Sequence, residues 1–390
     1  VEEGAESIDG IQKVDDKTVQ FTTKEEMPIT TFENSYARYL LTLPKHVIEQ
    51  YSEEELSTAD WFNHPDVVSG PFIVTDFDVD HYISYEANKD YWKGAPKIDK
   101  LNIKIVDGSQ LYAGLQSGEI DITQQTMSDI PQEDYESVEA LDNVDVVYGS
   151  PVTNQSVFIQ TKNVPDVKVR QAMLYAIDRQ QILEELLNGH GEIVDGFLSS
   201  ASPFYDDSLT PVSYDPEKAK ELLAEAGYPN GFECSLYVNG DVRTRSAQIV
   251  QAQLAEVGIT VDISTYEWGA LLDSLNAGDH EMFILGWSNT SFDADGSTYQ
   301  LFYSENHGTT GNRAFLTDEK VDELIIAAQK ESDDTKRMGL YKELQDRLHE
   351  ISPWCPLYYK YDNVGVRADL KGFKLHKGAQ HYLGNCHYEK

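Results

Sequence analysis

A strand, a helix and a second strand follow one another between residues 232 and 263, and this order strongly constrains the possible folds of the chain. Apolar residues alternate with others from Phe232 to Val238, which is the pattern of a strand with one buried face. A helical pattern at 246–257 leads to a second apolar alternation at 259–263. Two strands joined in this way are expected to be parallel, with a right-handed connection. The segment therefore predicts a mixed α/β fold.

Hydrophobic periodicity predicts further elements along the chain. The strongest helical pattern runs from 167 to 187, and Gly189 follows it. Residues 102–123 have the pattern of a buried strand, a short helix and another strand, which is the form of a compact crossover unit. Other strands are predicted at 17–21, 72–77, 81–85, 282–287 and 357–361, and other helices at 45–51, from Pro216, at 268–275, from Thr317 and at 335–351.

Length and charge narrow the class of protein. The 390 residues suggest two or three domains, and a hydrophobic content of 40% is enough for large cores. Lys and Arg number 31 against 67 Asp and Glu, which gives a net charge of −36. A surface this negative repels phosphate backbones and anionic membranes, so we expect no nucleic-acid partner. No apolar run approaches the length of a membrane span.

The sequence begins at Val1, without an initiator Met and without the pattern of a signal peptide. We therefore expect that a targeting segment was removed or that the chain begins inside a longer protein.

The three cysteines of the chain, Cys234, Cys355 and Cys386, are far apart, lack zinc-ligand spacing and allow one disulfide at most. Cys234 falls within a strand pattern and is predicted to be a small buried hydrophobe.

Motifs that carry chemistry are absent from the sequence. It contains no phosphate-binding, dinucleotide-binding, serine-hydrolase or zinc-protease signature. His376, His381, Cys386 and His387 gather near the C-terminus, but their spacing matches no closed metal site. We therefore predict a protein that is not an enzyme and that needs no cofactor and no metal.

Several short blocks carry a family resemblance, and together they extend over nearly the whole chain. They are S-G-P-F at 69–72, N-K-D-Y-W-K-G at 88–94, L-Q-S-G-E-I-D at 115–121, D-V-K-V-R-Q-A at 166–172, Y-A-I-D-R at 175–179, G-W at 286–287, and Arg337, Tyr341 and Gln345 on a helix before Pro353. In this order the blocks resemble the extracytoplasmic solute-binding proteins of peptide-type ABC importers, the oligopeptide, dipeptide and nickel family.

The resemblance implies an α/β fold that is bilobed, of the periplasmic-binding-protein type II (Venus flytrap) class. The chain would cross between the lobes near Thr153 and near Asn363, and two such strands form a hinge. Family members carry about a hundred further residues before the position of Val1, a substantial part of a lobe, so the N-terminal part of lobe I is expected to be missing. The implied divisions are a partial extra subdomain at 1–69, lobe I at 70–153 and 364–390, and lobe II at 154–363.

The function that the resemblance implies is the capture of peptides or peptide-like solutes and their delivery to the membrane permease of an ABC importer. The protein would be a monomer outside the cytoplasm, lipid-anchored in its full-length form, and its lobes would close on the ligand. One alternative is a different cargo, such as a nickel or haem chelate, an oligosaccharide or a glutathione-like peptide. A secreted hydrolase is a further alternative, which the absence of a catalytic signature disfavours.

The implied ligand-binding strand ends at residues 282–288. In the family, the equivalent strand end pairs with the main chain of a bound peptide, which here would involve Gly286, Trp287 and Ser288. Trp268 and Trp287 match positions that wall side-chain pockets, and their large apolar faces suit variable side chains. The alternative for both tryptophans is a place in the core.

Charged residues near this strand are the remaining candidates. Peptide binders of the family commonly hold an aspartate three residues after the tryptophan, where it pairs with the ligand's ammonium, and that position is Thr290 here. A buried ammonium needs an anionic partner, so either Asp293 or Asp295 takes over or the ligand is not held by a free N-terminus. The alternative for the two aspartates is a surface turn. Arg313 could clamp a ligand carboxylate or form a structural ion pair.

Overall fold

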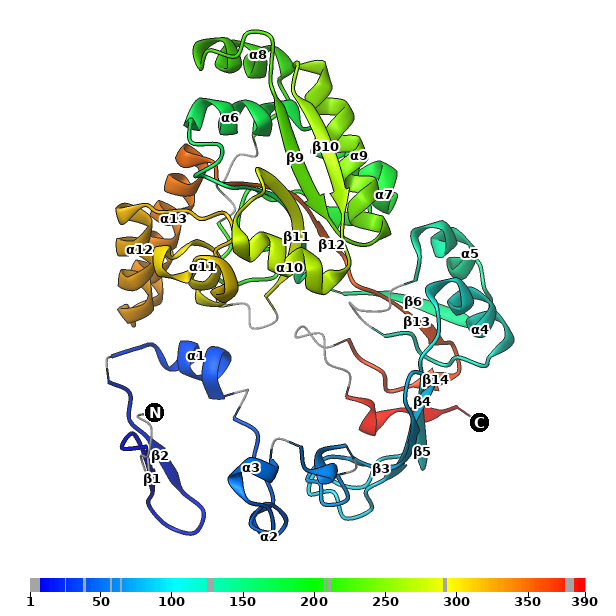
Figure 1. The fold of residues 1–390 in the computed structure, drawn as a ribbon. Helices are drawn as coiled ribbons and strands as arrows, with labels where there is room; N and C mark the ends of the chain where they lie inside the picture. The colour runs from blue at the N-terminus through cyan, green and yellow to red at the C-terminus, as the bar shows by residue number, and fades with distance from the viewer. Residues whose placement is uncertain are drawn as a thin grey trace. The chain divides into compact units, whose positions relative to one another are not determined.

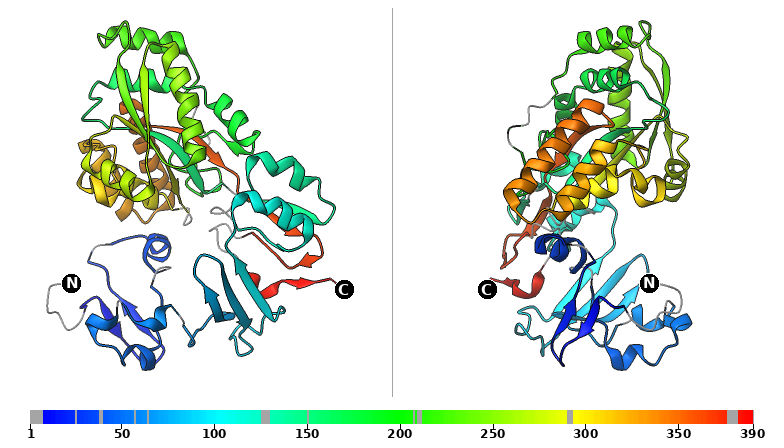
Figure 2. Two further views of the ribbon diagram at one scale, coloured as in Figure 1. Left: turned by 45° about the vertical axis from the view of Figure 1, so that its right-hand side comes forward. Right: turned by 90° about the vertical axis from the view of Figure 1, so that its left-hand side faces the viewer.

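The computed structural model describes residues 8–24, 26–37, 40–56, 58–63, 65–124, 130–149, 151–206, 208, 212–289, 293–375 and 382–389. The chain divides into two compact units. One unit consists of Val1–Tyr39, Ser156–Arg179 and Val194–Leu357, and the other of Leu40–Gln155, Gln180–Ile193 and Tyr358–Lys390. These divisions differ from the lobes implied by the resemblance, which stay a prediction. Figures 1 and 2 show the elements of both units.

A six-stranded sheet has the strand order β10-β9-β11-β7-β12-β8. β10 and β9 are parallel, with Thr260 opposite Glu233 and Thr265 opposite Val238, and β11 is parallel to β9. The helix α9 connects β9 to β10, so the parallel pair predicted from the sequence is confirmed (Figure 1). The elements are β7 (Thr153–Ile159), β8 (Gly191–Glu192), β9 (Glu233–Val238), α9 (Asp241–Glu256), β10 (Thr260–Thr265), β11 (Met282–Ser288) and β12 (Trp354–Lys360).

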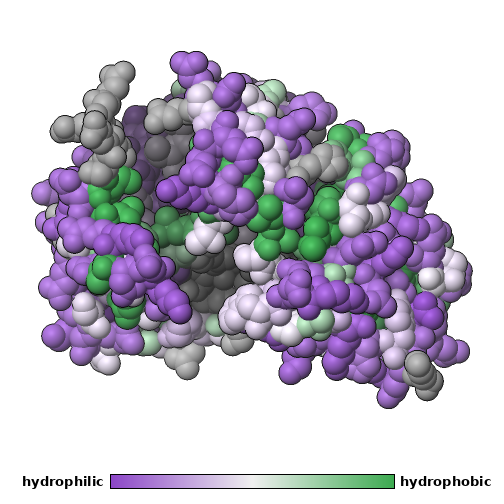
Figure 3. Space-filling model, turned by 90° about the horizontal axis from the view of Figure 1, so that it is seen from below, coloured by the Kyte–Doolittle hydropathy of each residue, from purple (hydrophilic) through white to green (hydrophobic). Residues whose placement is uncertain are grey.

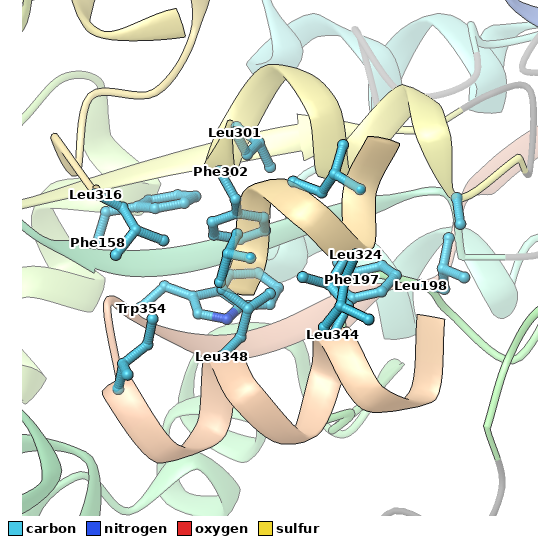
Figure 4. Packing of buried hydrophobic residues seen from close by; sticks show 14 of the residues in the cluster. Phe158, Phe197, Leu198, Leu301, Phe302, Leu316, Leu324, Leu344, Leu348 and Trp354 are labelled. Carbon is cyan, nitrogen blue, oxygen red and sulfur yellow. The ribbon is translucent and has the colours of Figure 1, made fainter. Parts of the chain in front are cut away.

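A hydrophobic cluster of described residues lies between this sheet and four helices that flank β11 in the sequence. Phe302 and Trp354 are almost fully buried, with their ring centroids 5.4 Å apart (Figure 4). Fully burying such a ring contributes roughly 1.5–3 kcal/mol, so the helices are held to the sheet mainly by apolar packing. Those helices are α10 (Trp268–Ala277), α11 (Asp295–Phe302), α12 (Glu319–Lys330) and α13 (Asp334–Ile351).

The helix predicted at 167–187 is wrong in one respect, because the structure contains two helices there. α6 (Val167–Ala176) ends where Ile177 adopts an extended backbone, and α7 (Arg179–Leu187) begins after Asp178. The Gln253 side chain of α9 compensates for this break, since it accepts from the Asp178 N–H and donates to the Asp178 carbonyl, both at 3.1 Å. A residue distant in sequence therefore supplies the hydrogen bonds that the backbone lacks at the break.

The second unit contains a three-stranded antiparallel sheet, with the order β3-β4-β5. The buried strand predicted at 102–106 is wrong, because β5 is largely exposed and Ile103 has 43% of its surface accessible. The predicted crossover unit also does not form: β5 pairs with β4, whereas Ile122 bridges Val366 in antiparallel fashion. The elements are β3 (Phe72–Asp78), β4 (Tyr82–Ala87), β5 (Lys100–Lys104), α4 (Leu111–Ser117), α5 (Tyr135–Glu139), β6 (Val144–Tyr148) and β13 (Asn363–Arg367).

The remaining elements are short or lie at the periphery. Most of the face in Figure 3 is hydrophilic, as the excess of acidic residues predicts. Smaller apolar patches are interspersed among the hydrophilic residues. Asp215 caps α8 by accepting from the Lys218 N–H, which confirms the predicted helix start there. These elements are β1 (Ile11–Lys13), β2 (Val19–Phe21), α1 (Ile29–Thr31), α2 (Lys45–Ile48), α3 (Glu53–Leu56), α8 (Pro216–Glu225), β14 (Leu370–Lys371) and β15 (His387–Tyr388).

All three cysteines are buried and unbridged, so the disulfide that the sequence allowed does not form. Burial raises the pKa of the Cys234 thiol to about 12, in keeping with the buried hydrophobe predicted for it. Of the C-terminal histidines, His376 and His381 lie outside the described residues. Within the part of the chain that the structure describes, no group of three or more potential ligands could hold a metal, and no helix is long and apolar enough to cross a membrane.

Candidate ligand-binding site

The parallel strands β9, β10 and β11 end at one edge of the sheet, and this edge is where a ligand is expected. In open α/β sheets, ligands bind outside the carboxyl ends of the strands, because loops and helix N-termini converge there. Here the residues that follow the three strands begin at Asn239, Tyr266 and Asn289. The sequence-predicted residues Trp268 and Trp287 belong to this edge.

β11 extends farther than β9, one of its two neighbours in the sheet, at this edge. Its register with β9 places Met282 opposite Leu236 and Phe283 opposite Tyr237, and β9 ends one residue later at Val238. The last four residues of β11, 285–288, therefore run past the end of β9. Burial decreases along them: β11 is buried through Leu285, partly exposed at Gly286 and Trp287, and exposed at Ser288. The end of β11 thus reaches the surface at the edge where a ligand is expected.

The two predicted tryptophans differ in their surroundings. Trp287 is partly buried against the hydrophobic cluster that contains Phe302 and Trp354, and its indole N–H donates to the Gly296 carbonyl at 3.1 Å. Trp268 is the first residue of α10 and has 51% of its surface exposed. Trp268 is therefore not the core residue that the alternative interpretation required, whereas Trp287 has both a packed face and an accessible one.

The loop after β11 is organised by side-chain contacts. The Asn289 amide donates to the Asp293 carbonyl and to the Ser297 hydroxyl, both at 2.8 Å. Thr290, where the family commonly has an aspartate, lies outside the described residues. The Asn289 contacts join the end of β11 to the start of α11.

Asp293 forms a buried ion pair with Arg337. The Arg337 Nη2 and Nη1 atoms donate to Asp293 Oδ1 at 2.7 Å and to Oδ2 at 3.0 Å, and the two residues are 0% and 1% exposed. Arg337 also donates to the Thr31 hydroxyl at 2.8 Å and to the Tyr341 hydroxyl at 3.1 Å. Burial opposes the charge of Arg337, but the hydrogen bonds and electrostatic interactions with Asp293 and Tyr341 together outweigh it and raise the Arg337 pKa. Both oxygens of Asp293 are thus committed to a protein cation.

Asp295 is buried as well, with 6% of its surface exposed. Its Oδ1 atom accepts from the Gln329 amide at 2.7 Å, and its backbone N–H donates to Asp293 Oδ1 at 2.9 Å. Burial raises the pKa of this carboxyl group. Neither aspartate lies in the surface turn of the alternative interpretation; both hold the loop against α12 and α13.

Arg313 lies at the other end of β11. Its Nε donates to the Asn276 side chain at 3.0 Å, and its carbonyl lies 3.0 Å from His280 Nε2. Asn276 is near the end of α10, and His280 precedes the first residue of β11. Burial lowers the pKa of Arg313, which forms no ion pair with any described residue. The structure therefore does not bring Arg313 together with Trp268 and Trp287.

Sequence reasoning missed charged residues after the other two strands. The Arg243 guanidinium, in the first turn of α9, donates to the Asn239 side chain at 2.7 Å. Glu267 immediately precedes Trp268, and its side chain is exposed. The available signal was the N-G-D turn after the strand at 232–238, combined with the rule that ligands bind at the carboxyl edge.

Comparison with known proteins identifies the family. The model of the bacterial extracellular solute-binding proteins, family 5 (middle part), matches residues 2–309. The chain belongs to this family. The heme-binding protein A of Haemophilus influenzae is 31% identical over 384 residues, covering 94% of this chain and 68% of the relative. The dipeptide-binding protein of Escherichia coli is 30% identical over 397 residues, covering 98% of this chain and 72% of the relative.

Solved structures agree with this assignment. The periplasmic binding protein DppA of Helicobacter pylori, in complex with the peptide STSA, matches with a TM-score of 0.84 at 27% identity, covering 98% of this chain and 74% of that one. The oligopeptide-binding protein AppA of Bacillus subtilis, in complex with a nonapeptide, gives a TM-score of 0.79 at 27% identity, covering 97% and 78%. The bilobed α/β class predicted from the sequence is confirmed, as is the assignment to an extracytoplasmic family of binding proteins.

Proposed function

We propose that this chain captures a peptide or peptide-like solute at the carboxyl edge of β9, β10 and β11, and delivers it to the permease of an ABC importer. The observation that carries the proposal is the course of β11, whose residues 285–288 run past the end of β9 and become exposed. Relatives named for dipeptide and oligopeptide binding, and solved structures that hold peptides, support the same ligand class.

Main-chain pairing would supply much of the affinity. A peptide laid along Gly286, Trp287 and Ser288 adds a strand, and the hydrogen bonds of such a strand do not depend on side-chain identity. Trp268 and the accessible face of Trp287 would contact ligand side chains through apolar area, which tolerates variation. Selectivity is therefore expected to be loose.

Charged contacts would orient the ligand. Arg243 offers a guanidinium at the end of β9, where a ligand carboxylate could accept from it. Asp293 and Asp295 are engaged with Arg337 and Gln329, so they are poor partners for a ligand ammonium. Glu267 is better placed for that role, because it is exposed beside Trp268.

A ligand screen tests the proposal. We expect peptides of two to nine residues to raise the melting temperature of the protein, because a ligand that binds only the folded state stabilises it. Oligosaccharides, haem and nickel–histidine complexes are the comparison set. Stabilisation by one of these and by no peptide would contradict the peptide assignment.

Replacing Trp268 by alanine should weaken peptide binding about tenfold or more, since an exposed aromatic anchor in an interface is commonly worth over 1 kcal/mol. The melting temperature should hardly change, because the ring lies outside the core clusters. Isothermal titration calorimetry with the best peptide of the screen measures the loss. Trp92→Ala is the control, since Trp92 is 75% exposed in the other unit and should leave the affinity unchanged.

A different cargo is the second candidate, favoured by the engagement of Asp293 and Asp295. Relatives named for heme and glutathione binding show that the family is not confined to ordinary peptides. Native mass spectrometry of the purified protein would identify a ligand retained from the cell.

The lipid anchor predicted for the full-length protein would be tested by labelling cells with a radioactive fatty acid.

A further inference from the structure

Asp293 and Asp295, shortly after the end of β11, are each bound to a neighbouring helix. Asp293 reaches Arg337 on α13, and Asp295 reaches Gln329 on α12. The loop begins at Asn289, directly after the strand end, and that residue is tied to the Asp293 carbonyl. Any displacement of Asp293 would therefore pass to the strand end through the hydrogen bond between Asn289 and the Asp293 carbonyl.

We infer that Arg337 is a positioning residue for the ligand-binding end of β11, acting through Asp293 without touching the ligand. This inference rests on the proposed function, since it concerns the same strand end. It assigns the buried ion pair a role in affinity as well as in stability.

The surroundings of Arg337 suit this role. Its guanidinium carbon lies 4.8 Å from the ring centre of Phe204 and 5.3 Å from that of Tyr341, so aromatic rings limit its movement. Its Nε donates to the Ala328 carbonyl of α12 at 3.1 Å, which ties α13 to α12. The two-point contact with Asp293 fixes the carboxylate in orientation as well as distance. An arginine held so closely can set where the loop lies.

A segment far away in sequence completes the arrangement. The Thr31 hydroxyl accepts from Arg337 Nη2 at 2.8 Å and lies 3.4 Å from Asp293 Oδ2. Thr31 is 2% exposed and ends the short helix α1. The N-terminal segment therefore also contributes to the position of the loop, through the same two charged residues.

A second buried ion pair in the same unit provides a matched control. Arg179 and Asp195 are 5% and 3% exposed, and the arginine donates to both carboxylate oxygens. Arg179 also donates to the Val212 carbonyl, and none of its contacts with described residues involves Asn289, Asp293 or Asp295. Arg179→Lys should therefore share the cost in stability of Arg337→Lys without its effect on the loop.

The test compares Arg337→Lys with Arg179→Lys. A lysine keeps the charge but cannot reproduce the two parallel hydrogen bonds of a guanidinium. Hydrogen exchange of the peptides that cover 285–297 should become about tenfold faster in Arg337→Lys and stay unchanged in Arg179→Lys. The Kd for the best peptide of the screen, measured well below both melting temperatures, should rise about tenfold in Arg337→Lys alone. Asp293→Asn serves as the second variant if Arg337→Lys does not fold.

The outcomes separate the two hypotheses. Unchanged exchange and unchanged affinity in Arg337→Lys would overturn the positioning role. Equal effects in both lysine variants would overturn it too, because they would reflect general destabilisation. If the wild-type protein binds no peptide, the proposed function fails, whereas loop exchange still decides whether Arg337 holds the strand end.

Discussion

Replacing Asp293 by alanine should lower the free energy of unfolding by about 3–5 kcal/mol, the usual cost of leaving one member of a buried ion pair without its partner. Arg337 is 0% exposed, so water cannot replace the lost carboxylate without opening the packing around it. The hydroxyl groups of Thr31 and Tyr341 would still accept hydrogen bonds from Arg337, but they carry no compensating charge.

Urea denaturation of the wild type and Asp293→Ala measures this loss. The double variant Asp293→Leu with Arg337→Met is the control: replacing both charges by apolar side chains should recover about half of the loss, because no charge is then buried unpaired. If Asp293 were instead a residue reserved for the ligand, Asp293→Ala would lose affinity at nearly unchanged stability. A loss below about 1 kcal/mol would exclude the ion pair as a major source of stability.

The role of Asp293 shows where sequence reasoning ends. Two aspartates two residues apart in a loop indicate a turn or a binding site equally well, since both are short-range patterns. Their partners, Arg337 and Gln329, come from later helices and meet them only in the folded chain. The family resemblance included Arg337 in one of its sequence blocks. A sequence block, however, does not show which residue Arg337 contacts.

Local patterns predicted the first unit better than the second. The strand–helix–strand segment around α9 is self-contained, so periodicity and the connection rule sufficed for its parallel pair. At 102–123 the same type of pattern was misleading, because Ile122 bridges Val366 on the distant strand β13 instead of pairing with β5. At the break after α6, the backbone of Asp178 likewise finds its partner in Gln253, which lies in another helix.

Arg313 illustrates a different limit. It follows the binding loop closely in sequence, which made it a candidate for the same site. In space the chain passes through α11 and returns to the amino end of β11, where Arg313 meets Asn276 and His280. Nearness in sequence therefore did not show at which edge of the sheet Arg313 lies. The direction of the strands shows it.

His280, which contacts the Arg313 carbonyl, gives the second large effect. It should make the protein less stable in mild acid. This histidine is 0% exposed, and burial lowers its pKa from 6.5 to about 4. Hydrogen bonding to the Arg313 carbonyl and the charges of Glu281 and Asp279 favour the protonated form, while the charge of Arg313 opposes it. Its Nδ1 atom, also buried, has no hydrogen-bond partner among the described residues, so a proton there would be unpaired.

The direction of the effect follows from these two pKa values. Between pH 6.5 and about 4 the unfolded chain binds a proton at residue 280 and the folded chain does not, so the unfolded state is favoured as the pH falls. The contribution of His280 is therefore complete above pH 6.5 and is lost on the way to pH 4. At about 1.4 kcal/mol per pH unit, the loss amounts to about 3 kcal/mol.

Other titratable groups also affect stability between pH 7 and 4. The contribution of His280 is therefore measured as the difference in unfolding free energy between the wild type and a variant that lacks the histidine. Gln at position 280 can donate to the Arg313 carbonyl as the Nε2 atom does, but it does not titrate. Urea unfolding of wild type and His280→Gln at intervals from pH 7 to 4 should give curves that diverge by about 3 kcal/mol, with the wild type losing more. Parallel curves would contradict the prediction. They would mean that His280 is protonated equally easily in the folded and the unfolded state.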